Sequence, residues 1–226
     1  MSATPFTGFD RRFFAFLKAL KAHNTREWFT AHKAQYQADV EAPALAFVAA
    51  FAPKLKAISP RFVADPRRTG GSMFRIYRDT RFSHDKTPYK THVGLHFWHD
   101  GDELESPPAF YLHLEPGEIF GGGGCWHPDP LTLRKIRLRI DAAPAEWRRV
   151  LATGFEIEGE TLTRVPAGFR ADHAFATDLK RKDHFMSEAF TAADAATPEF
   201  VETFATACRR MAPLMKFLTA AQGQRW

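Results

Sequence analysis

Residues 91–99, THVGLHFWH, and residues 110–115, FYLHLE, decide the fold of this chain. In both segments apolar and polar side chains alternate with a period of two, which is typical of a β-strand with one buried face. The polar residues 99–108 separate them, so we expect the two strands to pair as an antiparallel hairpin. The side chains expected on its buried face are Val93, Leu95, Phe97, Phe110, Leu112 and Leu114.

Further strands are expected around this hairpin. Residues 118–126 continue the alternation, although the run Gly121–Gly124 weakens it. We interpret the glycines as a bend or bulge in an edge strand rather than as a phosphate-binding loop. The remaining strand candidates are residues 74–77, residues 183–190, and a small hairpin of residues 155–157 and 161–165 around Gly159.

Both ends of the chain carry apolar residues at helical spacing. Residues 9–22 predict one helix, and Asn24 followed by Glu27 resembles a capping box that begins a second. This second pattern passes Pro43 and ends near Ile58. Further helices are expected at residues 130–140, at residues 144–153 and from Thr197 onward.

Strands grouped between helical ends predict an α+β fold, with a mainly antiparallel central sheet flanked by N- and C-terminal helices. The chain has 226 residues, of which 45% are hydrophobic, so it has enough apolar side chains for a substantial core. We expect a single domain over residues 1–226.

The two cysteines, Cys125 and Cys208, lie far apart in the sequence. This spacing argues against a disulfide framework and fits reduced thiols in a cytosol. Cys125 stands two residues before His127, but the sequence shows no third group to orient them as nucleophile and base.

The start of the chain and its apolar runs bear on its location. The first residues, MSATPFTGFDRRFF, lack the apolar core of a secretory signal. No apolar run approaches the ~20 residues that span a bilayer. We therefore expect a cytoplasmic protein without a membrane partner, whose oligomeric state the sequence does not indicate. The net charge of +5 favours anionic partners without indicating a nucleic-acid binder.

Residues 73–92, MFRIYRDTRFSHDKTPYKTH, interleave basic and aromatic side chains. Arginine grips phosphate or carboxylate through two parallel hydrogen bonds, and lysine adds a mobile charge. We therefore predict a pocket for a small anionic ligand, with no cofactor and with enzymatic activity left open. Its expected ligand-binding residues are Arg75, Arg78, Arg81, Lys86 and Lys90.

Other residues are candidates for catalysis in such a pocket. Asp79 and Asp85 are expected to orient the arginines or to act as a general base, and Tyr89 and His113 are candidate proton donors. One alternative is a structural or protein-interaction role, in which the arginines and aspartates only fasten a loop to the sheet. A second alternative is a nucleic-acid module, to which basic runs such as Lys180–Lys182 would add charge.

The polar face of the hairpin carries imidazoles and a carboxylate. If the strands pair, His92, His96, His113 and Glu115 point the same way, together with Tyr111. Such groups bind divalent metals. A solvated or helix-covered face is nevertheless the favoured interpretation, so no metal site is predicted.

Several motifs resemble one known family. Residues 75–94, RIYRDTRFSHDKTPYKTHVG, together with three shorter motifs, resemble the uncharacterised bacterial family Domain of Unknown Function 2461. The shorter motifs are NTREWF at residues 24–29, FYLHLEPGE at residues 110–118 and GGGGCWHP at residues 121–128. The resemblance runs from about Phe6 to Leu218 and implies a single domain in a bacterial cytoplasm. It implies no biochemical role, because the family carries no established role or catalytic assignment to transfer.

Overall fold

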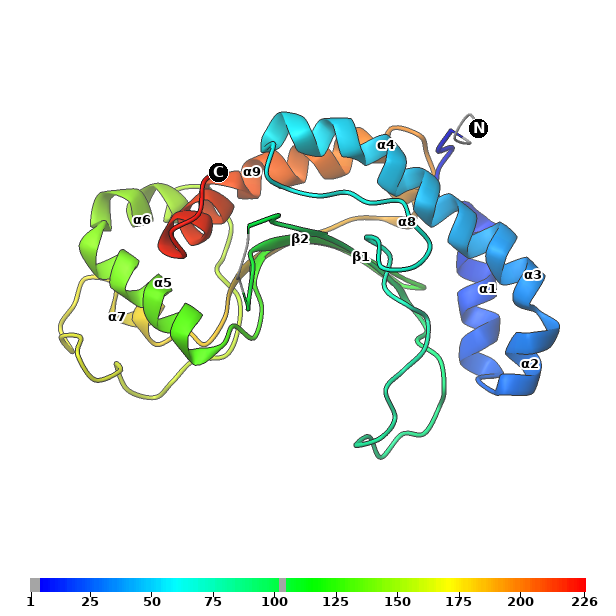
Figure 1. Cartoon of the computed structure of the whole chain (residues 1–226), viewed down its shortest axis with the longest axis horizontal. Coiled ribbons are helices and arrows are strands. Elements are labelled where there is room, and N and C mark those ends of the chain that lie inside the picture. Colours follow the sequence, from blue (N-terminus) through cyan, green and yellow to red (C-terminus); the bar gives the residue numbers. More distant parts are fainter. Residues whose placement is uncertain (1–4, 102–104) are drawn as a thin grey trace.

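The computed structural model describes residues 5–101 and 105–226 of the chain. Within these residues the centre is a four-stranded antiparallel sheet in the order β1-β2-β3-β4. The strands are β1 (Val93–Trp98), β2 (Ala109–Glu115), β3 (Glu118–Cys125) and β4 (His184–Ala189). With helices before and after it, this sheet confirms the predicted α+β fold (Figure 1).

The pairing of β1 with β2 confirms the predicted hairpin and its buried face. Leu95 stands opposite Leu112, and both side chains are fully buried. His96 stands opposite Tyr111, one position along, so these two side chains lie on the other face of the sheet. Within the connecting segment, residues 102–104 lie outside the described residues.

One series of helices precedes the sheet in the sequence. The later helices lie between β3 and β4 and after β4. The first series is α1 (Arg11–Ala22), α2 (Arg26–Ala31), α3 (Lys33–Tyr36), a π-helical turn η1 (Gln37–Glu41) and α4 (Ala42–Ile58). The later helices are α5 (Pro130–Ala142), α6 (Pro144–Leu151), α7 (Ala176–Leu179), α8 (Ala192–Ala195) and α9 (Phe200–Ala221). In the described ranges no helix combines the length and the apolar character needed to cross a membrane.

The predicted capping box at Asn24 is wrong by one residue. Thr25 is the N-cap of α2, because its hydroxyl accepts a hydrogen bond from the N–H of Trp28 at 3.2 Å. The Asn24 side chain instead binds the backbone of Tyr89. A partner 65 residues away has replaced the local cap, and sequence spacing does not reveal such a partner.

Two of the predicted strand segments, residues 74–77 and residues 155–165, are extended connections rather than strands. Alternation predicts an extended backbone but no partner, and these segments or the residues next to them make single bridges instead of ladders. In particular, residues 155–165 bridge to the region of β4 and not to each other. The bridges are Met73–Leu95, Tyr77–Tyr89, Glu158–Phe185 and Thr161–Arg181.

Helices α4 and α9 cover one face of the sheet (Figure 1). Phenylalanines fill this interface: the ring of Phe51 on α4 lies 4.8 Å from that of Phe97 on β1 and 4.9 Å from that of Phe204 on α9, between centroids. All three side chains are fully buried. In Figure 1 no described helix covers the opposite face, to which His96 and Tyr111 belong.

The glycine run lies on a central strand, so the prediction of an edge strand there is wrong: β3 pairs with both β2 and β4. A Cβ atom on Gly121 would lie 2.8 Å from the ring of Phe204, and one on Gly123 would lie 3.1 Å from the ring of Phe110. The absence of side chains therefore allows α9 to pack closely against the middle of the sheet.

Candidate functional site

The segment with the densest basic charge forms a loop that projects from one end of the sheet, drawn in teal and green at the lower right of Figure 1. We call residues 74–90 the basic arm. Two backbone hydrogen bonds close its base, from Arg78 N–H to Pro88 O at 2.9 Å and from Lys90 N–H to Ile76 O at 2.7 Å. The two sides of the arm therefore run antiparallel, and residues 79–87 form its tip.

The turn between α1 and α2 fastens the base of the basic arm. The Asn24 side chain donates a hydrogen bond to Tyr89 O at 2.9 Å and accepts one from Tyr89 N–H at 3.1 Å. The ring of Phe29 stacks on the ring of Tyr89 with centroids 4.2 Å apart. Tyr89 is buried, and burial raises the pKa of its hydroxyl. These contacts anchor the arm to the turn between α1 and α2.

A pocket of about 420 Å³ lies at the base of the basic arm. Its wall combines the end of α1, the turn before α2, the arm and the residues just before β1. Lys21, Arg78 and Lys90 contribute cations, and Asp85 is the carboxylate that lines it among the described residues. The other lining residues are Asn24, Thr87, Tyr89, Thr91 and His92.

Arg78 is held in place within the arm. Its Nη1 donates to the carboxylate of Asp85 and to the hydroxyl of Thr87, and its Nη2 lies 3.5 Å from the hydroxyl of Ser83. The N–H of Thr87 and the Arg78 guanidinium hold the pKa of the Asp85 carboxyl below its usual value. Asp85 therefore orients Arg78 and is poorly suited to act as a base.

Lys90 differs from the other cations of the arm because it is half-buried and has no carboxylate partner in the described ranges, whereas Arg75 and Lys86 are exposed and Arg78 and Arg81 pair with aspartates. Its Nζ lies 5.3 Å from the centroid of the Phe74 ring. Burial lowers the pKa of Lys90, and the nearby Arg75 lowers it further. The pocket thus holds a partly desolvated ammonium that an anion would stabilise.

The other predicted ligand-binding residues do not line the pocket. Arg81 pairs with Asp79 at 2.7 Å, and both side chains are mostly exposed at the tip of the arm. The hydrogen bond from Arg81 lowers the pKa of Asp79. Lys86 donates to Thr80 O at 2.9 Å. Arg75 is exposed beside Lys90 and lies outside the pocket wall.

Lys21 is a pocket residue that the sequence did not suggest. It lies in the last turn of α1, and its Nζ pairs with Glu115 at 3.2 Å. A single lysine at a helix end carries no distinguishing pattern. Only its position just before the NTREWF motif at residues 24–29 could have directed attention to it.

The polar face of the hairpin brings together three of the four predicted groups. Ligand atoms of His92, His113 and Glu115 lie within 4.8 Å of one another. Burial lowers the pKa of His92, and the neighbouring His113 lowers it further. His96 stands apart: it stacks on Phe74 with ring centroids 5.4 Å apart, and burial lowers its pKa to about 4.

Cys125 is not placed to act as a nucleophile. It is buried, and burial raises the pKa of its thiol to about 12. The imidazole of His127 faces another group, because its Nδ1 lies 3.5 Å from the carboxylate of Asp183, which also accepts the His127 backbone N–H at 2.6 Å. A thiol that stays protonated at neutral pH reacts slowly.

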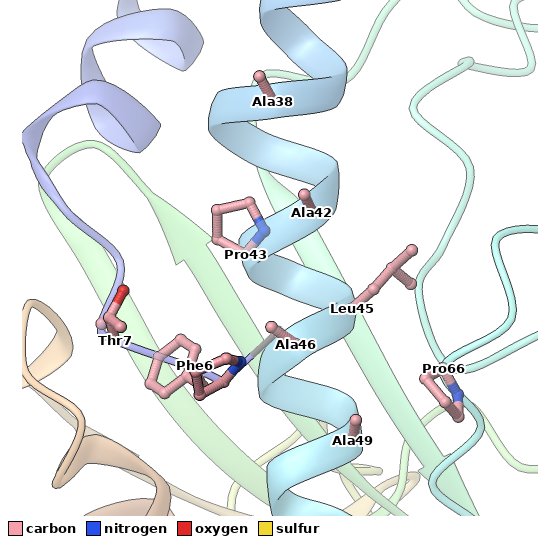
Figure 2. Close-up of a pocket in the computed structure, with 11 residues that line it drawn as sticks. Phe6, Thr7, Ala38, Ala42, Pro43, Leu45, Ala46, Ala49 and Pro66 are labelled. Atoms are coloured by element: carbon pink, nitrogen blue, oxygen red, sulfur yellow. The ribbon is translucent and has the colours of Figure 1, made fainter. Parts of the chain in front are cut away.

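A second hollow, of about 450 Å³, has an apolar wall. No titratable side chain lines it among the described residues. It therefore offers packing surface but no groups for catalysis or for holding an anion. Figure 2 shows Phe6 and Leu45 at this hollow, with Ala38, Ala42, Pro43, Ala46 and Ala49 along η1 and α4.

Comparison with known proteins gives one match. A family model described as "Conserved hypothetical protein (DUF2461)" matches residues 12–217, which include the basic arm and the whole sheet. Among curated proteins and solved structures no match was found.

Proposed function

We propose that this chain, which belongs to the DUF2461 family of conserved hypothetical proteins, binds a small phosphate- or carboxylate-bearing ligand at the base of the basic arm. The observation that carries the proposal is Lys90, a half-buried ammonium without a carboxylate partner in the described ranges. A charge removed from water costs free energy unless an opposite charge is near. A bound anion supplies that charge.

The charges around Lys90 favour the same ligand. Lys21 and Arg78 line the pocket as well, but each has a carboxylate partner, Glu115 for Lys21 and Asp85 for Arg78. Among the described residues of the pocket wall, Lys90 therefore keeps the uncompensated charge. Asp85 and Thr87 hold the Arg78 guanidinium, so less side-chain entropy is lost when it donates to a ligand. Charge-assisted hydrogen bonds to phosphate or carboxylate are stronger than those between neutral groups.

The proposal is for binding and assigns no catalytic step. Of the four predicted catalytic residues, Asp85 and Tyr89 line the pocket, and both have structural partners. Asp79 lies at the tip of the basic arm, and His113 lies on the sheet next to His92.

Thermal unfolding in the presence of phosphate, pyrophosphate or citrate tests the proposal. A ligand at 100 times its Kd stabilises the folded state by about 2.7 kcal/mol, so the melting temperature should rise. Lys90→Met should abolish this rise. Lys86→Met removes the same charge from the same arm outside the pocket, so it should retain the rise.

Two outcomes would contradict anion binding at this pocket. One is that none of these anions stabilises the wild-type protein. The other is that Lys90→Met lowers the melting temperature without added anion but leaves the rise with anion intact. The second result would assign the charge of Lys90 to stability alone.

The exposed aromatic ring at the tip of the arm favours a second candidate function, the binding of single-stranded nucleic acid. Phe82 is 92% exposed, and the Arg81 guanidinium carbon lies 5.8 Å from its ring centroid. Cations beside exposed rings can contact phosphates and stack bases. The basic runs elsewhere add little, because their members Arg181, Lys182, Arg209 and Arg210 pair with carboxylates.

Oligonucleotide titration separates the two candidates. Binding of a strand would weaken steeply between low and high salt and would depend on Phe82. Binding of a small anion in the pocket depends on Lys90 instead.

A further inference from the structure

Three candidate metal ligands meet where β1 begins and β2 ends. His113 and Glu115 alternate along β2 and therefore share a face of the sheet. Val93 pairs with Leu114, which places His92, the residue before β1, beside Glu115. One ligand atom from each of the three residues then lies within 4.8 Å of the other two.

His113 is held with one ring nitrogen free. Its ring stacks on Phe120 with centroids 4.8 Å apart and 11° between the planes. Its Nδ1 lies 3.2 Å from the Tyr111 hydroxyl, whereas its buried Nε2 has no hydrogen-bond partner among the described residues. A histidine that binds a metal through one nitrogen usually makes such an orienting hydrogen bond with the other. A ligand at Nε2 would remove the free-energy cost of an unpaired buried nitrogen.

Glu115 is also held by hydrogen bonds, which leave one of its carboxylate oxygens facing His113. Its Oε1 accepts hydrogen bonds from Lys21 Nζ at 3.2 Å and from the Thr91 hydroxyl at 3.1 Å. Its Oε2 faces Nε2 of His113 at 3.5 Å, which is longer than an ordinary hydrogen bond. The Lys21 side chain is 65% exposed, so its ammonium can move into solvent when a cation binds.

We propose that His92, His113 and Glu115 bind one divalent transition-metal ion of the zinc class. Two imidazoles and a carboxylate suit Zn²⁺, Co²⁺ or Ni²⁺ better than Mg²⁺ or Ca²⁺, and three protein ligands leave a position for water or substrate. Two ligand atoms that each lie about 2.1 Å from a tetrahedral ion are about 3.4 Å apart. Ligand atoms that now lie up to 4.8 Å apart must therefore close by as much as about 1.4 Å on binding.

The metal site does not require a bound anion, although it shares His92 with the anion pocket. His92 lines the pocket at the base of the basic arm, so an ion bound to it would add positive charge to that wall. The proposal does not require an anion there. A metal ion and an anion are therefore tested separately: Lys90→Met changes the pocket and none of the three metal ligands, and His113→Gln changes a metal ligand that does not line the pocket.

Titration of untagged, chelator-treated protein tests the metal site. Calorimetry with Zn²⁺ should show one ion bound per chain, and Co²⁺ should give the visible absorption of a four- or five-coordinate complex. His92→Gln, His113→Gln and Glu115→Gln should each weaken binding at least tenfold. His96→Gln, on the same sheet face but outside the cluster, should keep the wild-type affinity, and so should Lys90→Met.

The wild-type protein alone can overturn the proposal, since failure to form a one-to-one complex with Zn²⁺ or Co²⁺ refutes it. Equal loss of binding in His96→Gln and in the three ligand variants also refutes it.

Glu115→Gln removes the contact with Lys21 too, so its fold must be verified by circular dichroism. If a ligand variant does not fold, Co²⁺ is added to the wild-type protein. Selective broadening of the His92 and His113 imidazole NMR signals supports the site, and broadening elsewhere excludes it.

Discussion

At the scale of single residues, His184 has the least favourable position in the core. Its side chain is fully buried beside Trp147, and neither ring nitrogen has a hydrogen-bond partner in the described part of the chain. Burial lowers its pKa to about 3, and the guanidinium groups of Arg137 and Arg181 add to the effect. A free imidazole has a pKa near 6.5. Between these values the unfolded chain binds a proton that the folded chain does not.

His184 should therefore make the protein sensitive to acid. As the pH falls from 6.5 toward 3, its contribution should lower the free energy of unfolding by up to about 1.4 kcal/mol per pH unit, because the unfolded state binds one more proton. His184→Leu removes this contribution, so its stability relative to the wild type should rise on acidification. Urea unfolding at neutral and acidic pH measures the difference.

His84→Leu is the matched control, because His84 is exposed on the basic arm. This variant should not gain stability relative to the wild type as the pH falls. If both variants gain equally, the burial of His184 is not the cause of the acid sensitivity.

At the scale of elements, the basic arm depends on the turn between α1 and α2. Asn24→Ala leaves the N–H and C=O of buried Tyr89 without their side-chain partners. We expect a loss of about 1–3 kcal/mol in the free energy of unfolding. The amides of Arg78 and Lys90 should also exchange hydrogen faster, because they close the base of the arm. Hydrogen-exchange mass spectrometry measures this effect.

Thr25→Ala is the control for that experiment, since it removes the N-cap of α2 at the adjacent position. This variant should lower the free energy of unfolding by about 0.5–2 kcal/mol but leave amide hydrogen exchange in the arm unchanged. Faster exchange in the arm of both variants would mean that α2 as a whole, and not the Asn24 hydrogen bonds, holds the arm.

The elements also show where reasoning from sequence succeeds and where it stops. The hairpin was predictable because alternation along Val93–Trp98 is a local property that specifies the buried face. The glycine run was misplaced because β4, which covers one side of β3, follows only after 58 intervening residues. The contacts of Asn24 and Lys21 could not be predicted for the same reason. Their partners, Tyr89 and Glu115, are distant in sequence.

In the candidate site, composition identified the arm but could not show which charges face inward. Five cations were predicted to bind a ligand, and of these Arg78 and Lys90 line the pocket. Arg81 stands three residues after Arg78 in the same run of basic and aromatic residues. It lies at the exposed tip, whereas Arg78 lies at the base, where its side chain lines the pocket together with Lys21 of α1. That distinction depends on tertiary contacts.

At the scale of the whole molecule, the two proposed sites lie at the same end of the sheet. Segments from α1, the basic arm, β1 and β2 meet there, whereas α5, α6 and α7 lie at the other end (Figure 1). His92 belongs to both sites, because it lines the pocket and contributes to the metal cluster. Charges held this close in a partly desolvated region interact strongly.

The binding of a metal ion and the binding of an anion should therefore be coupled. Zn²⁺ at the cluster should strengthen phosphate binding, and phosphate should strengthen Zn²⁺ binding by the same factor, because equilibrium linkage is reciprocal. Ordinary couplings of this kind are about 5- to 150-fold. Calorimetric titration of each ligand, with and without saturating amounts of the other, measures both factors.

Lys90→Met should retain Zn²⁺ binding and lose the effect of phosphate on it, whereas Lys86→Met should retain both. Equal affinities with and without the second ligand would mean that His92 transmits no charge interaction between the two sites.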